Sequence, residues 1–376
     1  MKHRGVSYDV GRFMSFNWRP DFHRNVVRRE LQIIRDDLHA NAVRICGLSL
    51  RRLKIAADEA LQLGLEVWLS PEMWDKSPDR TLAYIATAAA VAEELRARYS
   101  QQLFLIIGSE FTLFMPGIVE GRNLAARMGH PSFIDRVRAG DHNPPLNRFL
   151  AEACSVVGAV FRGQITYASL PWECVDWGLF DFVGVDHYRS ARNEDRYADT
   201  LRQHFAHGKP VLITEFGYAT CQDGIGGSGG FLASSGLGAD IVDARSQYFH
   251  FAIPFVGRFI RPRVRGVHTR DERWQARRLV EHLGILDAAG VDGAFVFQFI
   301  SQMTPCDDDP LYDVDTASTS LVKYFEHGFR GTTYPDMKWQ SKESFHVVAD
   351  HFARTPAATD ASEAPRPRQD GGPPLP

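Results

Sequence analysis

Two glutamates each follow an apolar run, at the point where a buried strand would reach the surface. Glu110 comes directly after residues 104–109, and Glu215 comes directly after residues 211–214. Retaining cleavage of a glycosidic bond needs a protonated carboxyl that donates to the leaving oxygen and an ionised carboxylate, roughly 5 to 5.5 Å away, that attacks the anomeric carbon. The two glutamates have the side chains for this chemistry, provided that the fold brings them together.

Eight short β-branched or aromatic runs predict the strands that would position these residues. They are Arg4–Asp9, Ala42–Cys46, Leu65–Ser70, Phe104–Gly108, Gln164–Ala168, Phe182–Asp186, Val211–Thr214 and Gly293–Phe297. Helical patterns fill the connections, near residues 21–39, 51–63, 82–99, 146–161, 196–206, 272–289 and 341–352. This alternation predicts an α/β fold of parallel strands joined by crossover helices. A closed (β/α)₈ TIM barrel is the most economical arrangement, although an open doubly wound sheet fits the same periodicity.

A single barrel, residues 1–353, accounts for most of the chain. Two connections are too long to be turns: residues 111–143 after the fourth strand and residues 219–270 after the seventh. Long loops of this kind usually build a site. Within the second, the Gly/Ser-rich residues 224–238 predict a flexible lid. Residues 354–376 are rich in Pro and Ala and are expected to form a disordered tail.

The C-terminal ends of barrel strands carry the active face, so polar residues there are candidates for a site. They are Asp9, Arg44, Glu72, Glu110, Trp172, His187, Tyr188, Glu215 and Gln298. A solvated strand edge would explain any one of them equally well. Their number favours a functional site.

The segment Ile213-Thr214-Glu215-Phe216-Gly217 resembles the nucleophile segment of clan A of the glycoside hydrolases, barrel enzymes with catalytic glutamates at the ends of strands four and seven. The resemblance covers about residues 4–352. It implies that Glu110 is the acid/base and Glu215 the nucleophile. It also implies a carbohydrate or glycoconjugate substrate and no cofactor.

Two further segments share this resemblance. Residues 42–45 resemble the strand-two segment whose arginine, here Arg44, approaches the nucleophile and would keep it ionised. Residues 183–188 resemble the strand-six segment that supplies an aromatic hydroxyl or an imidazole, here Tyr188 or His187, to the same carboxylate. A surface ion pair for the arginine, and rim hydrogen bonds for the other two, remain open.

The sequence departs from the clan pattern at two positions. The clan has Asn before its acid/base, whereas this chain has Ser109, whose shorter hydroxyl indicates an altered substrate or a barrel diverted from hydrolysis. Strand eight ends in residues 297–299, Phe-Gln-Phe, where the clan brings a tryptophan as a sugar platform. Trp172 or Trp74 could supply the stacking instead, although core packing explains each as well. The residues expected to bind substrate are Asp9, Arg44, Ser109, Trp172, His187, Tyr188 and Gln298.

Composition narrows the class of partner. The 43 basic and 46 acidic residues give a net charge of −3, which indicates neither nucleic acid nor anionic lipid as a partner. No apolar signal region and no stretch of bilayer length are seen, so we expect a cytoplasmic protein. The five cysteines form no CxxC pair, and no HExxH motif occurs, so neither a disulfide framework nor a metal site is predicted. Oligomeric state stays open.

Three hypotheses follow for function. The first is a retaining O-glycoside hydrolase that uses Glu110 and Glu215. The second is a glycosidase-derived barrel that performs transglycosylation or another acid–base reaction in a biosynthetic pathway. The third is a non-enzymatic sugar-binding or defence protein. A barrel hosts many functions, so only the site discriminates between them.

Overall fold

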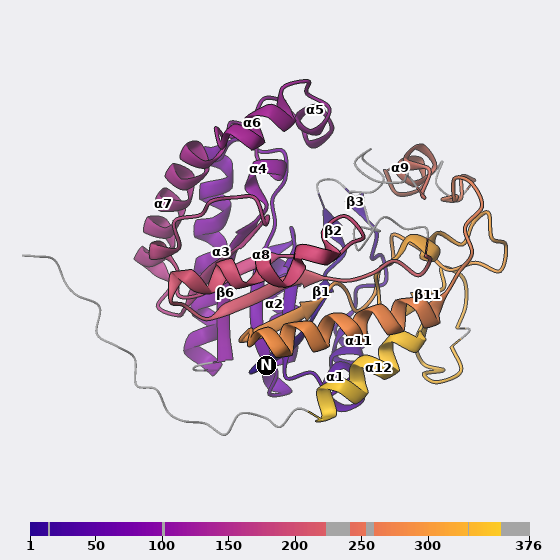
Figure 1. Ribbon diagram of the computed structural model, residues 1–376. Coiled ribbons are helices and arrows are strands. Elements are labelled where there is room, and N and C mark those ends of the chain that lie inside the picture. Colours follow the sequence, from indigo (N-terminus) through magenta and orange to yellow (C-terminus); the bar gives the residue numbers. More distant parts are fainter. Residues whose placement is uncertain (14–15, 100–101, 223–240, 253–258, 330, 355–376) are drawn as a thin grey trace, which may run out of the picture.

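The computed structural model describes residues 1–13, 16–99, 102–222, 241–252, 259–329 and 331–354 (Figure 1). Eight parallel strands close into a barrel in the order β1-β10-β9-β8-β7-β6-β5-β4. The strands are β1 (His3–Asp9), β4 (Ala42–Gly47), β5 (Glu66–Pro71), β6 (Leu103–Ser109), β7 (Ile165–Ser169), β8 (Val183–Asp186), β9 (Val211–Phe216) and β10 (Gly293–Val296). The predicted (β/α)₈ barrel is confirmed, the open sheet is excluded, and every predicted strand overlaps an observed one.

Helices surround the barrel and cover the outward faces of its strands (Figure 1). They are α1 (Arg24–Asp36), α2 (Leu50–Gln62), α3 (Pro78–Tyr99), α7 (Asn143–Val160), α8 (Tyr197–His204), α11 (Glu272–Ala289) and α12 (Glu343–Arg354). Each turns one apolar stripe inward: α1, for example, buries Val27, Leu31 and Ile34 at helical spacing. None of the helices in the described residues is long and apolar enough to cross a membrane.

Aromatic rings fill the N-terminal end of the barrel. Trp68 stacks on Phe104 with 4.2 Å between ring centroids, and Phe182 and Phe295 meet Trp68 edge-on at 5.0 and 5.7 Å. Gly5 makes room for this packing, because a Cβ atom there would lie 2.3 Å from the Phe295 ring. With the floor of the barrel closed, a ligand site can form only at the other end.

Short elements lie in the connections between the barrel strands and the main helices, most of them at the C-terminal end of the barrel and without a counterpart among the predicted elements. They are β2 (Arg12–Phe13), β3 (Phe16–Asn17), α4 (Phe111–Phe114), α5 (Leu124–Met128), α6 (Phe133–Ala139), η2 (Trp177–Leu179), η3 (Glu194–Arg196), η4 (Phe205–His207), α9 (Ala244–Ala252), η6 (Val314–Ala317), β11 (Val322–Tyr324) and β12 (Trp339–Ser341). In Figure 1 the α4–α6 segment rises at the upper left and α9 at the upper right. The predicted lid, 224–238, and all but the first residue of the predicted tail, 354–376, lie outside the described residues.

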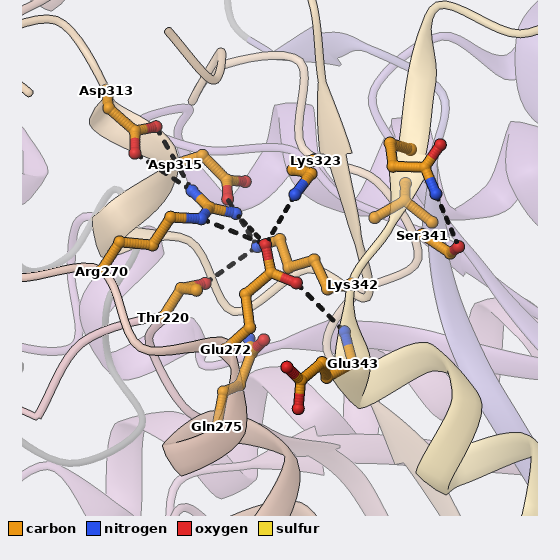
Figure 2. Close-up of polar contacts among 12 residues, drawn as sticks. Thr220, Arg270, Glu272, Gln275, Asp313, Asp315, Lys323, Ser341, Lys342 and Glu343 are labelled. Atoms are coloured by element: carbon orange, nitrogen blue, oxygen red, sulfur yellow. Dashed lines mark hydrogen bonds and ion pairs between the residues drawn. The ribbon is translucent and has the colours of Figure 1, made fainter. Parts of the chain in front are cut away.

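A buried network of ion pairs ties the loops after β9 and β10 to the start of α12 (Figure 2). We call it the loop-anchoring network, and its members are Arg270, Glu272, Asp313, Asp315, Lys323 and Lys342. Lys342 and Asp315, both fully buried, are 2.8 Å apart. Arg270 lies 2.8 Å from Asp315 and 2.9 Å from Glu272.

The network also fixes the backbone that approaches the barrel mouth. Lys342 donates to the Thr220 hydroxyl over 2.9 Å, and Thr220 donates to the carbonyl of Ser318 over 2.9 Å. The loops after β9 and β10 are therefore held together by charged and hydroxyl groups beside the barrel, outside its mouth.

Candidate active site

Glu215 stands near the end of β9 between a cation and a hydroxyl. Arg44 Nη1 makes a close ion pair with Glu215 Oε1. Tyr188, just beyond β8, donates its hydroxyl to Glu215 Oε2 over 2.9 Å. Arg44 Nη1 also donates to the carbonyl of Thr214 over 3.2 Å, which fixes the guanidinium beside the strand end. These are the partners that an ionised carboxylate requires.

Glu110, directly after β6, has the opposite environment. Its side chain is buried, and among the described residues its Oε2 atom has no hydrogen-bond partner. Burial, together with the charges of Asp186 and Glu215, raises the pKa of Glu110 well above its usual value. A carboxyl group in this setting is protonated at neutral pH.

The backbone at Glu110 is unusual as well. Glu110 adopts left-handed angles, φ 48° and ψ 44°, and its N–H donates to the carbonyl of Ala168 over 2.9 Å. A non-glycine residue in this region costs roughly 1–2 kcal/mol, and such residues cluster at functional sites. The local turn directs the chain from β6 into α4.

Two buried side chains that the sequence analysis missed hold this turn. Tyr167 on β7 accepts a hydrogen bond from the N–H of Phe111 over 2.7 Å. Glu173 accepts from the N–H of Thr112 over 3.2 Å and from the Tyr167 hydroxyl over 3.1 Å. Glu173 lies in a loop with no motif around it, so spacing alone offered no signal for its role.

Asp186 at the end of β8 is a third buried carboxyl group at the barrel mouth. It accepts hydrogen bonds from the hydroxyls of Ser109, over 3.0 Å, and Thr214, over 2.6 Å. Burial first, and the charge of Glu215 second, raise the pKa of Asp186 above its usual value. It was not among the predicted site residues, although the alternation of residues 182, 184 and 186 along the strand directs its side chain into the barrel.

Arg44 and Ser109 were predicted to bind substrate, but the structure engages both with protein groups. Arg44 is completely buried and also pairs with Glu72 over 3.3 Å, so it contacts carboxylates and is closed to a ligand. Burial raises the pKa of Glu72 to about 8. The Ser109 hydroxyl donates to Asp186 and is therefore not directed at a sugar.

A cleft with about 670 Å³ of empty space opens over the ends of β10, β1, β4 and β5. Asp9, Gln298 and Trp74 line it together with Glu72. Burial raises the pKa of Asp9 to about 6. The two catalytic candidates end β6 and β9, so the cleft lies beside them and connects to Glu215 through Glu72 and Arg44.

Two predicted residues lie elsewhere. Trp172 packs edge-on against Phe133 and His142, at 6.3 and 5.1 Å, and is not part of the cleft lining. The His187 ring packs on Tyr197 at 4.4 Å, and burial lowers its pKa to about 3. Of the two side chains considered for contact with the nucleophile, Tyr188 therefore provides it, and His187 supports α8.

Within the described residues, no three His, Cys, Asp or Glu side chains are arranged to hold a metal ion. The five cysteines, all of which lie in the described residues, are free thiols. The chemistry that the site residues themselves support is thus that of carboxyl groups in contrasting environments.

Solved structures with the same architecture are glycoside hydrolases. A family GH113 β-1,4-mannanase superposes with a TM-score of 0.55 at 14% identity, covering 94% of this chain and 100% of its own. A family 1 β-glucosidase from Thermotoga maritima gives 0.53 at 12% identity, covering 93% and 97%. A β-glucuronidase from Bacteroides uniformis gives 0.51 at 13%, covering 94% of this chain and 35% of its own.

No protein-family model and no curated protein matches the sequence. At 12–14% identity the structural likenesses establish the fold, which is that of barrel glycoside hydrolases. The resemblance to clan A that the strand-end motifs indicated is confirmed at this level.

Proposed function

We propose that this protein is a retaining glycoside hydrolase in which Glu215 is the nucleophile and Glu110 the acid/base. The observation that carries the proposal is the contrast between the two carboxyl groups. One meets an arginine and a tyrosine hydroxyl, which favour the anion, and the other is buried among negative charges, which favour the acid. A pair of carboxyl groups with separated roles is what double displacement requires.

In the first step Glu215 Oε attacks the anomeric carbon, the bond to the leaving oxygen breaks, and Glu110 donates its proton to that oxygen. In the second step a water oxygen attacks the same carbon, the bond to Glu215 breaks, and Glu110 accepts the proton of the water. Tyr188 and Arg44 hold Glu215 in position for the attack and stabilise it again when it leaves as an anion.

The substrate class follows from the cleft and from the neighbours. Carboxyl, amide and indole groups line the cleft, a combination that suits hydroxyl groups and the CH faces of a sugar. The similar structures are named for β-mannan, β-glucoside and β-glucuronide cleavage, so β-glycosides are the first class to test.

The test is covalent labelling with 2,4-dinitrophenyl 2-deoxy-2-fluoro-β-glycosides of glucose, mannose, galactose and glucuronic acid, followed by peptide mass spectrometry. We expect one adduct, on Glu215. Glu110→Gln should still be labelled, because dinitrophenolate leaves without a proton, whereas Glu215→Gln should not. An adduct on another residue, or no adduct together with no hydrolysis of the parent glycosides, would contradict the proposal.

A further inference from the structure

The buried carboxyl group of Asp186 connects the two halves of the candidate site. Its Oδ2 atom accepts from Ser109, the residue before Glu110, and its Oδ1 atom accepts from Thr214, the residue before Glu215. Its side chain has no exposed surface. Double displacement as described above assigns no task to this third carboxyl group.

The hydrogen bonds indicate which carboxyl group carries the proton. Asp186 accepts from two hydroxyls and has Arg44 Nη1 4.0 Å away, and these neighbours stabilise an anion. Glu110 Oε2 has no partner among the described residues and is buried, which favours the neutral acid. When two interacting carboxyl groups share one proton, it resides mainly where the anion is least stabilised, here on Glu110.

Charged and titratable groups from several elements act on this pair. Those near Glu110 are Asp186 and Tyr188 from the end of β8, Glu215 from β9, Tyr167 and Glu173 from β7 and its loop, and Arg44 from β4. Those near Asp186 are Glu215, Arg44, Tyr188 and Glu72. Of these, Glu215 loses its charge during turnover, when its oxygen is esterified by the sugar.

We propose that Asp186 is a positioning residue that keeps Glu110 protonated in the free enzyme and again in the glycosyl-enzyme, so that removal of the sugar from Glu215 is slow at neutral pH and accelerates with alkali. The inference rests on the proposed function. It predicts a glycosyl-enzyme that persists at neutral pH.

The proton balance shows why. Glu110 gives its proton to the leaving oxygen and becomes a carboxylate, next to the Asp186 anion. In a site with only two carboxyl groups, esterification of Glu215 would remove the negative charge that favours protonation, and Glu110 would stay ionised as a base. Here Asp186 remains an anion beside Arg44, 4.0 Å away, so Glu110 takes a proton back from a solvent water, whose hydroxide is released to the solvent. Glu110 then cannot accept a proton from the attacking water until the pH rises.

The primary test needs no sugar. Carbon-13 NMR of protein labelled at the glutamate carboxyl carbon, titrated from pH 4 to 10, follows Glu110, whose resonance is identified by its loss in Glu110→Gln. In the unsubstituted protein we expect Glu110 to remain protonated at pH 7. Asp186→Asn should raise its acid dissociation constant about tenfold or more, because a neighbouring charge is removed.

A second pair of variants keeps the test valid if Asp186→Asn does not fold. Thr214→Val removes the hydroxyl that donates to Asp186, which shifts the shared proton toward Asp186 and should also raise the acid dissociation constant of Glu110. Thr214→Ser keeps the hydroxyl and should leave it unchanged. A Glu110 carboxyl that is already ionised at pH 7, or one unaffected by both Asp186→Asn and Thr214→Val, overturns the proposal.

A kinetic readout separates this inference from the proposed function. With a dinitrophenyl β-glycoside that the enzyme cleaves, intact-mass spectrometry at pH 7 should show the glycosyl-enzyme accumulating, and less of it in Asp186→Asn. An adduct on Glu215 that never accumulates during turnover overturns the role of Asp186 while leaving the glycosidase intact. No adduct and no hydrolysis with any of the β-glycosides, together with the expected titration, overturns the glycosidase and leaves the Asp186–Glu110 proton assignment standing.

Discussion

Two buried clusters of charge in this protein differ in their balance. The loop-anchoring network joins three cations, Arg270, Lys323 and Lys342, to three carboxylates, Glu272, Asp313 and Asp315 (Figure 2). At the barrel mouth the described residues place a single arginine, Arg44, among four carboxyl groups, Glu72, Glu110, Asp186 and Glu215.

The equal numbers of cations and carboxylates in the loop-anchoring network indicate a structural role, whereas the excess of carboxyl groups at the mouth indicates a chemical one. Charges that are paired in equal number can be buried with little change in protonation, and removing one partner is costly because the other is left buried and unpaired. Where carboxyl groups outnumber cations, some must hold protons at neutral pH, and the raised pKa values of Glu110 and of Glu72, the latter about 8, reflect this excess. The excess makes the mouth suitable for proton transfer.

The largest expected effect is on activity at the mouth. Glu215→Gln should lower kcat/KM by at least about 10⁴-fold, because the nucleophile is lost. Its free energy of unfolding should change by no more than about 1 kcal/mol, since the amide oxygen still accepts from Arg44, the amide NH2 can donate to the Tyr188 oxygen, and a crowded charge is removed. Steady-state kinetics and urea denaturation measure the two quantities. Near-normal activity would remove the distinction between the clusters.

The reverse pattern is expected in the loop-anchoring network. Lys342→Met leaves Asp315 buried with one cation fewer, and the free energy of unfolding should fall by about 3–5 kcal/mol. Lys54→Met is the matched control, because its partner Glu94 is half exposed and the loss should be below about 1 kcal/mol. Equal losses in the two variants would mean that burial does not strengthen the network.

A smaller effect on activity is expected from the hydroxyl that faces the nucleophile. Tyr188→Phe removes a 2.9 Å hydrogen bond to Glu215, which is worth about 1.5–3 kcal/mol, so kcat/KM should fall by roughly 10- to 100-fold. Tyr197→Phe removes a buried hydroxyl that donates to the carbonyl of His187 instead, and should affect stability without changing kcat/KM. Comparable kinetic losses would indicate a structural role for both.

A pH dependence of stability is expected as well. The pKa of Glu72 rises from 4.5 to about 8 on folding, so the folded state holds a proton that the unfolded chain releases between these values. The free energy of unfolding should therefore decrease as pH rises through this window, by up to about 1.4 kcal/mol per pH unit from this group. Glu72→Gln should show a shallower slope in urea denaturation at pH 5 to 8, and the exposed control Glu343→Gln should not. Parallel slopes for all three proteins would contradict the raised pKa.

The barrel was predictable because buried parallel strands leave continuous apolar runs, and the chain has eight of them. The position of the candidate catalytic pair was predictable for a related reason: a glutamate that ends such a run, as Glu110 and Glu215 do, must lie at the mouth. These inferences use only the chain direction and the burial of each strand.

The remaining site residues depend on packing that the sequence does not encode locally. His187 and Tyr188 are adjacent, yet one turns to α8 and the other to Glu215, and only the three-dimensional structure shows which. For Trp172 the sequence left sugar stacking and core packing open, and the structure packs its ring against Phe133 and His142. Asp186 could have been found by continuing the two-residue period of its strand.

The aromatic rings that close the N-terminal end of the barrel determine from which side molecules can enter and leave the site. Because Trp68, Phe104, Phe182 and Phe295 close the far end, the proposed reaction would bring the sugar, the departing alcohol and the attacking water through one opening. The alcohol must leave through this opening before water or a second acceptor alcohol can enter the site. The time that the departing alcohol stays in this opening decides whether water or an acceptor alcohol reaches the sugar. The product of turnover therefore depends on the order in which molecules pass through a single opening.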